Sequence, residues 1–155
     1  MPSNHALVFG ASGISGWNTI VQALSYPTPT TFTSITGVTN RPLSKAEALL
    51  PEDERVILVS GIDLSLTPET AIEALKAKVP TIADITHVFF YAYIHEPKGE
   101  SVVAANTRIV ENALAALKHL SPKLKHFVLQ TGGKVRHPLL FVSNIINVRS
   151  SRRME

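Results

Sequence analysis

The chain has 155 residues, of which 45% are hydrophobic and 17% charged, a balance typical of a folded globular domain and unlike that of a disordered chain. It contains no cysteine, which excludes disulfides and thiolate metal sites, and its six histidines show no metal-ligand spacing, so we expect no metal. No apolar run reaches the ~18 residues that cross a bilayer, and the first residues lack the features of a secretory signal, so we expect a soluble, cytoplasmic protein with no membrane partner.

The net charge of +3 resides at the carboxyl-terminal end of the chain. Residues 135–155 hold one acidic residue and four basic ones, which are Arg136, Arg149, Arg152 and Arg153, so residues 1–134 are neutral overall. A short basic tail without interleaved aromatic residues is a poor indication of nucleic-acid binding, because a chain terminus is usually solvated. We therefore expect no nucleic-acid partner.

The first part of the chain predicts a strand, a glycine-rich turn, a helix and a second strand. Residues 6–9 form a short apolar run, and residues 10–16 contain three glycines. Within residues 17–24 the apolar side chains share one helical face. After two prolines, residues 32–39 are rich in β-branched side chains and lead into an Asn-Arg-Pro turn, which indicates a strand.

The remainder of the chain repeats this alternation of strands and helices. Residues 56–59 predict a third strand, and Thr67, Pro68 and Glu69 give a cap, a proline and an acid at the start of a helix that continues to about residue 78. The nearly continuous apolar run 87–93 is typical of a strand in a parallel sheet that is covered on both faces. A long amphipathic helix over 102–120 and a strand over 127–129 follow. The pattern predicts an α/β fold, with a Rossmann-like, doubly wound parallel sheet of about five strands.

The glycine-rich turn is the first candidate site. Gly10, Gly13 and Gly16 have the spacing G-x-x-G-x-x-G between a predicted strand and a predicted helix. Glycines in this position allow a tight turn and close approach of a pyrophosphate, which the backbone amides of the turn, Ser12 and Ile14 included, and the helix dipole would hold. The alternative is a glycine-rich turn that binds no ligand.

The residues after the second and third strands bear on the choice of cofactor. Where an NAD site carries an acid for the ribose hydroxyls, this sequence has Asn40 and Arg41. A guanidinium pairs well with a 2′-phosphate, so Arg41 favours NADPH, although a solvated arginine in an Arg-Pro turn is the alternative. Asp63 could accept a hydrogen bond from the adenine amino group or could serve a local turn.

These motifs resemble those of the progesterone 5β-reductase and iridoid synthase-like enone reductases, which are atypical extended short-chain dehydrogenases/reductases. The resemblance covers roughly residues 5–134 and includes Asp63-Leu64 and Asn106 in the long helix. Its most specific mark is the segment Leu129-Gln130-Thr131-Gly132-Gly133-Lys134. The resemblance implies a cofactor contact by Thr131 and a catalytic role for Lys134 beside the nicotinamide ribose. A solvated lysine in a flexible turn is the alternative.

The sequence departs from this family after Lys134. The family continues to a catalytic tyrosine and a substrate domain, whereas residues 135–155 resemble neither. We therefore expect a nucleotide-binding domain over 1–134, incomplete and without its substrate domain, followed by a divergent basic tail over 135–155. The three tyrosines of the chain, Tyr26, Tyr91 and Tyr93, lie outside the family's tyrosine segment, and we interpret Tyr91 and Tyr93 as wall or core residues.

The resemblance implies the NADPH-binding part of a reductase that, when complete, transfers a hydride to the C=C bond of a small enone. A noncatalytic NADPH-binding or sensor module, or a truncated gene product, is the alternative, since a fold alone does not fix a function. Whether the chain itself is an enzyme, and whether it forms a homo-oligomer, stays open at this point.

Overall fold

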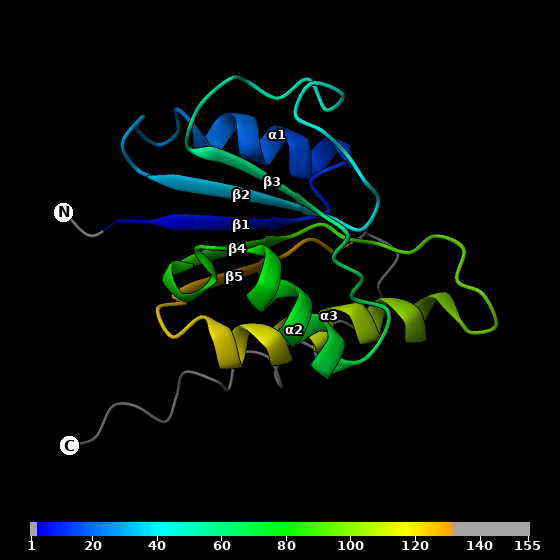
Figure 1. Ribbon diagram of the computed structural model, residues 1–155. Coiled ribbons are helices and arrows are strands. Elements are labelled where there is room, and N and C mark those ends of the chain that lie inside the picture. Colours follow the sequence, from blue (N-terminus) through cyan, green and yellow to red (C-terminus); the bar gives the residue numbers. More distant parts are fainter. Residues whose placement is uncertain (1–2, 132–155) are drawn as a thin grey trace, which may run out of the picture.

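Five parallel strands form the centre of the structure, in the order β3-β2-β1-β4-β5 (Figure 1). The computed structural model describes residues 3–131. The strands are β1 (His5–Phe9), β2 (Ser34–Thr39), β3 (Val56–Ser60), β4 (His87–Phe90) and β5 (His126–Leu129). All four neighbouring pairs are parallel. The predicted Rossmann-like parallel sheet is confirmed.

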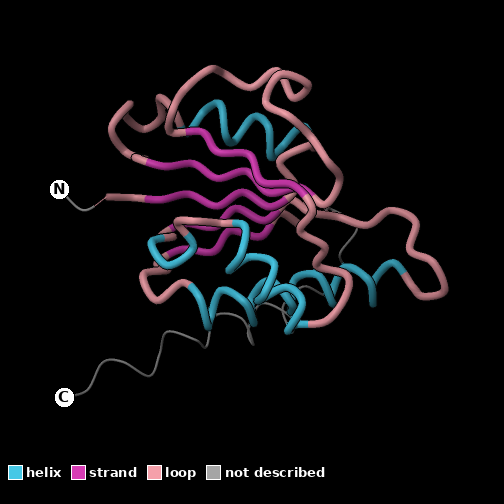
Figure 2. The backbone as a smooth tube through the Cα atoms, viewed as in Figure 1, coloured by secondary structure: helices cyan, strands magenta, loops and turns pink. Residues whose placement is uncertain are grey.

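The helices cover the sheet on two sides (Figure 2). α1 (Ile14–Ala23) connects β1 to β2 on one face, while α2 (Pro68–Lys78) and α3 (Val102–Leu120) lie together on the other face, with the short 3₁₀ helix η1 (Ile82–Asp84) leading into β4. The chain moves outward from β1 to β3 and then crosses to β4 on the other side of β1. The carboxyl ends of β1 and β4 therefore meet where the winding reverses, which is the place at which open α/β sheets bind ligands.

The core has two layers because side chains alternate along each strand. Leu7 and Phe9 belong to the larger cluster, which packs under α2 and α3, and Ala6 and Val8 belong to the smaller cluster under α1. The rings of Phe9 and Phe90 lie 5.3 Å apart in the larger cluster. With Ala6, Leu7 and Val8 at 0% exposure, β1 is the buried axis of the fold.

Capping residues mark the points at which α2 and α3 begin. Thr67 caps α2 as predicted, because its hydroxyl accepts a hydrogen bond from the backbone amide of Thr70. Pro68 lies in the first turn of the helix. Ser101 caps α3 in the same way through the amide of Ala104. Among the described residues, no helix is both long and apolar enough to cross a membrane.

β4 is shorter than the predicted strand over 87–93. It ends at Phe90, although the apolar run continues to Tyr93. The reason is that its partner β1 ends at Phe9 and turns away at Gly10, so the carbonyl of Phe9 accepts the amide of Tyr91 and the ladder stops. β2 likewise begins at Ser34, after the predicted start at residue 32, because its pairing with β1 begins there.

His87 occupies an aromatic cluster on β4. Its ring lies 5.3 Å from that of Phe32 and 4.9 Å from that of His126, and its Nδ1 is 2.8 Å from the Thr86 hydroxyl. Burial, and then the nearby positive charges of His126 and Lys125, lower the pKa of His87 below its ordinary value. The folded state thus favours the neutral ring.

This lowered pKa predicts that the protein loses stability in mild acid. The unfolded state, where His87 titrates at about 6.5, binds more protons than the folded state as the pH falls below that value. The free energy of unfolding should therefore decrease between about pH 7 and about pH 5. Urea unfolding across this range measures the slope, and His87→Phe should make it shallower.

The control for this measurement is His119→Gln, which alters an exposed histidine in the last turn of α3. This variant should keep the slope of the parent. A pH dependence of unfolding that is identical in His87→Phe and the parent would show that His87 is not its source.

Candidate nucleotide-binding site

The glycine-rich loop leaves β1 under a strict backbone constraint. Gly10 has a φ of +81°, in the region that favours glycine, and a Cβ on it would lie 2.7 Å from the backbone nitrogen of Ala92. The amides of Gly10 and Ala11 both donate to the carbonyl of Val38, at 3.1 and 3.2 Å. The loop is thus fixed between the ends of β2 and β4.

Gly13 and Gly16 meet different surroundings. A Cβ on Gly16 would lie 2.2 Å from the carbonyl oxygen of Gly10, so only glycine lets α1 begin this close to the end of β1. A Cβ on Gly13 would meet nothing nearer than that same oxygen at 3.5 Å, an ordinary contact. Gly13 is exposed and borders open space, whereas Gly16 is a packing residue.

The amino-terminal end of α1 can accept an anion. Gly13 is the N-cap and supplies no side-chain acceptor, and the first turn contains no acidic residue. The first amides of a helix have no partner within the helix, and they point, with the positive end of the helix dipole, toward the space beside Gly13. This cradle fits a pyrophosphate by its chemistry and by the room in front of Gly13.

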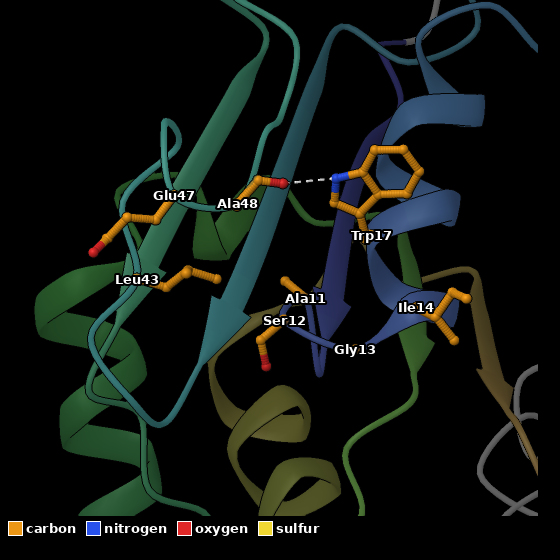
Figure 3. Close-up of a pocket in the computed structure, with 8 residues that line it drawn as sticks. All are labelled: Ala11, Ser12, Gly13, Ile14, Trp17, Leu43, Glu47 and Ala48. Carbon is orange, nitrogen blue, oxygen red and sulfur yellow. Dashed lines mark hydrogen bonds between the residues drawn. The ribbon is translucent and has the colours of Figure 1, made fainter.

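A pocket of about 380 Å³ adjoins the glycine loop (Figure 3). One wall comes from the loop and the first turn of α1, and the other comes from the segment that follows β2. The lining residues are Ala11, Ser12, Gly13, Ile14, Trp17, Leu43, Glu47 and Ala48. The indole Nε1 of Trp17 donates to the carbonyl of Ala48 at 2.9 Å and joins the two walls.

The segment 39–48, which forms the second wall, is held at its start by hydroxyl groups. Thr39 donates to the carbonyl of Arg41 at 2.7 Å and to the hydroxyl of Ser60 at 3.1 Å. The amide of Leu43 donates to Ser60 Oγ, which lies 3.2 Å from the carbonyl of Leu43. This leaves Arg41 exposed on a defined turn, and its guanidinium forms no ion pair with any residue in the described part of the chain.

A one-turn capping box shapes the middle of the same wall. The carboxylate of Glu47 accepts hydrogen bonds from the Ser44 hydroxyl at 2.6 Å and from the Ser44 backbone amide at 2.9 Å. The backbone amide of Ala48 donates to the carbonyl of Ser44. The Ser44 hydroxyl, followed by the Ser44 amide, lowers the pKa of Glu47 below its ordinary value. The carboxylate is directed toward Ser44 and away from Ser12 and Trp17 (Figure 3).

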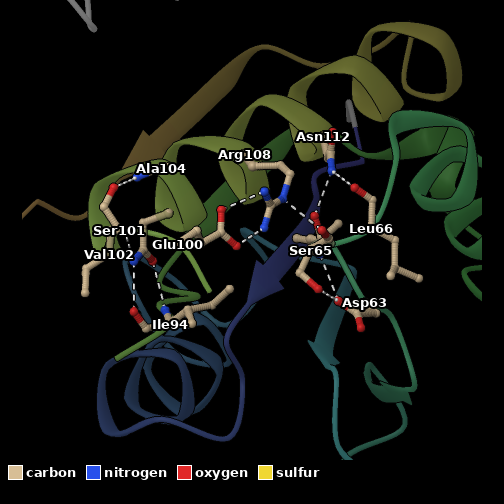
Figure 4. Close-up of polar contacts among 12 residues, drawn as sticks. Asp63, Ser65, Leu66, Ile94, Glu100, Ser101, Val102, Ala104, Arg108 and Asn112 are labelled. Atoms are coloured by element: carbon tan, nitrogen blue, oxygen red, sulfur yellow. Dashed lines mark hydrogen bonds and ion pairs between the residues drawn. The ribbon is translucent and has the colours of Figure 1, made fainter. Parts of the chain in front are cut away.

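Asp63 serves the local turn after β3. Its Oδ1 accepts the amide of Ser65 at 2.8 Å and the hydroxyl of Ser65 at 2.6 Å (Figure 4). An adenine contact by Asp63 would therefore have to use Oδ2. Of the two roles open to Asp63 from sequence, the turn is the one observed, and the adenine contact stays a prediction.

Polar side chains of α3 hold the loops that follow β3 and β4 (Figure 4). Arg108 donates to the carbonyl of Ser65 at 2.8 Å and forms a bidentate ion pair with Glu100, which lowers the pKa of that carboxyl. Asn112, 3% exposed, donates to the carbonyls of Leu64 and Leu66. The helix α3 thus holds the loop after β3 and the loop after β4, which are the two rims of the candidate site.

Asn106 belongs to the same network. Its side-chain oxygen Oδ1 accepts a hydrogen bond from the backbone N–H of Ile94 at 2.8 Å, and its Nδ2 donates to the carbonyl of Ile94 at 2.9 Å. Tyr91, near the glycine loop, accepts a hydrogen bond from the hydroxyl of Thr19 and is half-buried, in agreement with its interpretation as a wall residue. Tyr93 is 57% exposed and packs against His95, which excludes the core alternative for this residue and leaves the wall alternative.

The cofactor-binding residues predicted from sequence gather at the carboxyl edge of the sheet. The glycine loop follows β1, Asn40 and Arg41 follow β2, and Asp63 follows β3. Thr131 follows β5 and is exposed, and Lys134 lies outside the described residues. The carboxyl ends of parallel strands share one edge, so the topology alone brings these positions together. Their contacts with a cofactor stay predictions.

Sequence analysis missed the pocket wall over 43–48 and the α3 network. The spacing Ser44-x-x-Glu47 is that of a capping box and was a usable signal for the turn. The polar residues Arg108 and Asn112 are four apart and share one face of α3, which was a signal for a polar contact on that face. No local pattern in the sequence indicates that Trp17 binds the carbonyl of Ala48.

The geometry predicts opposite outcomes for two glycine substitutions. Gly13→Val should leave the fold intact, because a Cβ fits there, and should abolish nucleotide binding, because the branched side chain fills the pyrophosphate space. Gly16→Ala should destabilise the protein, since its methyl group collides with the Gly10 carbonyl. Urea unfolding and titration calorimetry with NADPH separate the two effects. A Gly13→Val variant that binds NADPH like the parent would place the site elsewhere.

Comparison with known proteins identifies the family. The short chain dehydrogenase sirQ of Leptosphaeria maculans is 40% identical over 129 residues, which are 82% of this chain and 33% of that protein. An (S)-8-oxocitronellyl enol synthase of Nepeta racemosa is 32% identical over 128 residues, covering 82% of this chain and 30% of that protein. The chain thus spans about a third of the length of these relatives.

The fold has matches among solved structures. A short-chain dehydrogenase/reductase of Saccharomyces cerevisiae superposes with a TM-score of 0.54 at 18% identity, over 84% of this chain and 54% of that one, a likeness of fold alone. The family model described as the PRISE-like Rossmann-fold domain matches residues 6–149. The glycine loop, the sheet order and this match agree, and the chain belongs to the PRISE-like Rossmann-fold domain family.

Proposed function

We propose that this chain is the NADPH-binding portion of a short-chain dehydrogenase/reductase that, in its complete form, reduces the C=C bond of an enone. The observation that carries the proposal is the open glycine loop at the start of α1, together with the exposed Arg41 in the turn after β2. The amides at the start of α1 border the space beside Gly13, and the turn after β2 presents Arg41 with no acidic residue at the strand end.

Different residues of the site would bind different parts of the cofactor. The glycine loop would hold the pyrophosphate, and the pocket between Ser12 and Leu43 would take the adenosine ribose. Arg41 comes two residues after β2 and two residues before the pocket residue Leu43, where its guanidinium would form a charge-assisted bidentate pair with a 2′-phosphate. An NAD site would instead have a carboxylate there for the ribose hydroxyls.

The reaction follows from the cofactor and from the named activity of a relative. When bound, NADPH supplies a hydride, and its addition to the β-carbon of an enone leaves the product as an enol or enolate. The Nepeta racemosa relative is named an enol synthase, which supports this class of substrate. The part of this chain is to bind and orient the cofactor at the carboxyl edge of the sheet. A charged group such as Lys134 would stabilise the negative oxygen, the role that the family resemblance implies for it.

The placement of the tyrosines favours a second candidate, a noncatalytic NADPH-binding module. The chain contains three tyrosines, and all are in the described part. Tyr26 follows the far end of α1, the hydroxyl of Tyr91 is engaged by Thr19, and Tyr93 is exposed against His95. Tyr26 and Tyr93 form no side-chain hydrogen bond within the described residues, and the Tyr91 hydroxyl, which accepts from Thr19 beside α1, keeps its own proton without an acceptor among those residues. A module that binds the cofactor without reacting fits this arrangement.

The assignment of Arg41 predicts a preference for NADPH over NADH. The preference should amount to ~1 to 3 kcal/mol, the scale of a charge-assisted contact that is partly open to water. Arg41→Ala should remove most of it by weakening NADPH alone. Titration calorimetry of both cofactors measures the change, with Lys76→Ala on the distant face of α2 as a charge-matched control. Equal affinities of the parent for the two cofactors would contradict the NADPH assignment.

The 155-residue chain should show no useful enone reductase activity even with NADPH bound. Hydride addition builds negative charge on the enone oxygen, and the loss of one positioned donor there costs roughly 10² to 10³ in rate. The assay is NADPH consumption with 2-cyclohexen-1-one, on the parent and on Lys134→Ala. Turnover by the parent that Lys134→Ala abolishes would contradict this prediction. A longer form that includes the family's tyrosine should be active, whereas a cofactor-bound but inert longer form would favour the binding module.

A further inference from the structure

The face of the sheet that carries α1 is covered unevenly. α1 is the one described helix on this face and packs against β1 and β2, whereas α2 and α3 lie on the other face (Figure 2). Parallel sheets are normally buried on both faces, because their connections place helices on each side. Within residues 3–131, β4 and β5 therefore have no helix over their α1 side.

Apolar side chains occupy this uncovered part of the sheet. Phe89 on β4 and Val128 on β5 are partners in the strand register, and the ring of Phe89 lies edge-on to the buried ring of Phe32. Val128 is 45% exposed, and among the exposed large apolar side chains of the described residues it is the one that lies in a strand. The core cluster under α1 thus extends to Phe89 and ends at an open surface at Val128.

We propose that residues 139–148 of this chain fold back over the α1 side of β4 and β5 and cover Phe89 and Val128. These ten residues lie outside the described part of the chain and read Leu-Leu-Phe-Val-Ser-Asn-Ile-Ile-Asn-Val. Seven of them are apolar and none is charged, in a chain of which 17% is charged. Burial of such a run against an open apolar surface removes both from water. The proposal does not depend on the cofactor.

The length of the connection suits this return. Thr131, the last described residue, lies three positions after Val128, and residue 139 follows eight positions later. Eight extended residues reach at most ~27 Å, whereas a strand of four residues is only about 10 Å long. A crossover to a parallel strand needs about a dozen residues or more, so the segment would run antiparallel to β5. β5 is the outermost strand on this side, and the chain therefore leaves the sheet beside the uncovered surface.

The covalent connection favours this segment over a second copy of the chain. A short flexible linker gives a tethered segment an effective concentration of the order of millimolar. A second copy would have to associate from free solution, and the surface of one four-residue strand is small beside the ~800 Å² that each partner of a stable complex buries. The family match reaches residue 149 and so includes the whole segment.

The first test labels the surface in the whole 155-residue chain. The chain contains no cysteine, so Val128→Cys gives a single attachment point for a benzophenone. On irradiation the label should cross-link to residues 137–149, which trypsin releases as one peptide because Arg136 and Arg149 flank it. Mass spectrometry identifies the product. The same label at Tyr26→Cys, an exposed position beyond the end of α1, is the control and should not capture this peptide.

The products of this reaction decide between the possible occupants. Capture of residues 137–149 within one molecule supports the proposal. Capture only in a cross-linked dimer would show that a second copy covers the surface. A label that reacts with other peptides alone, or with none, would show that residues 139–148 do not lie there. Each of the last two results overturns the proposal.

Amide exchange gives a second test without a bulky label. In a double variant, Leu140→Ser with Phe141→Ser, the amides of β5 should exchange at least about tenfold faster than in the parent, because two large apolar side chains no longer cover the strand. The amides of β1 should keep their protection, since β1 is buried by other contacts. Arg152→Ser with Arg153→Ser, outside the segment, is the control. Exchange of β5 at the parent's rate in the Leu140 and Phe141 variant would overturn the proposal.

Discussion

The structure depends on the close approach of α1 to the end of β1. A Cβ on Gly16 would lie 2.2 Å from the carbonyl oxygen of Gly10, and Gly10 itself lies against the backbone of Ala92 after β4. These contacts bring the start of a helix, the end of β1 and the exit of β4 to one point. No side chain intervenes in front of the helix amides there, so the packing constraint and the proposed pyrophosphate site are the same feature.

Local patterns were sufficient for most of the fold. Every strand of the sheet was predicted from a short apolar or β-branched run, and the start of α2 from Thr67 and Pro68, since these signals act within a few residues. The end of β4 was not predictable from its own residues, because it depends on where β1 turns away at Gly10. A strand ends where its partner ends, and a single sequence does not display the partner.

As with the fold, the features of the candidate site that are local in sequence were predictable, and those that depend on a distant partner were not. The glycine spacing and Arg41 are local features, and parallel topology brings them to one edge. The opposite wall of the pocket was missed because Trp17 and Ala48 are distant in sequence and form a side-chain to main-chain contact, which leaves no residue pattern at Ala48. Asn112 was missed likewise, since its partners are the carbonyls of Leu64 and Leu66. A contact to a main-chain group that is distant in sequence, unlike a helix cap, leaves no motif that would reveal it.

The polar face of α3 makes the two far rims of the site a single mechanical body. Arg108 binds the carbonyl of Ser65 after β3 and, through Glu100, the loop after β4, while Asn106 holds Ile94 in that second loop. A displacement of α3 would therefore carry both rims in the same direction. The loop after β3 and the loop after β4 are held by the same helix, so a force applied to one end of α3 would be transmitted to both loops.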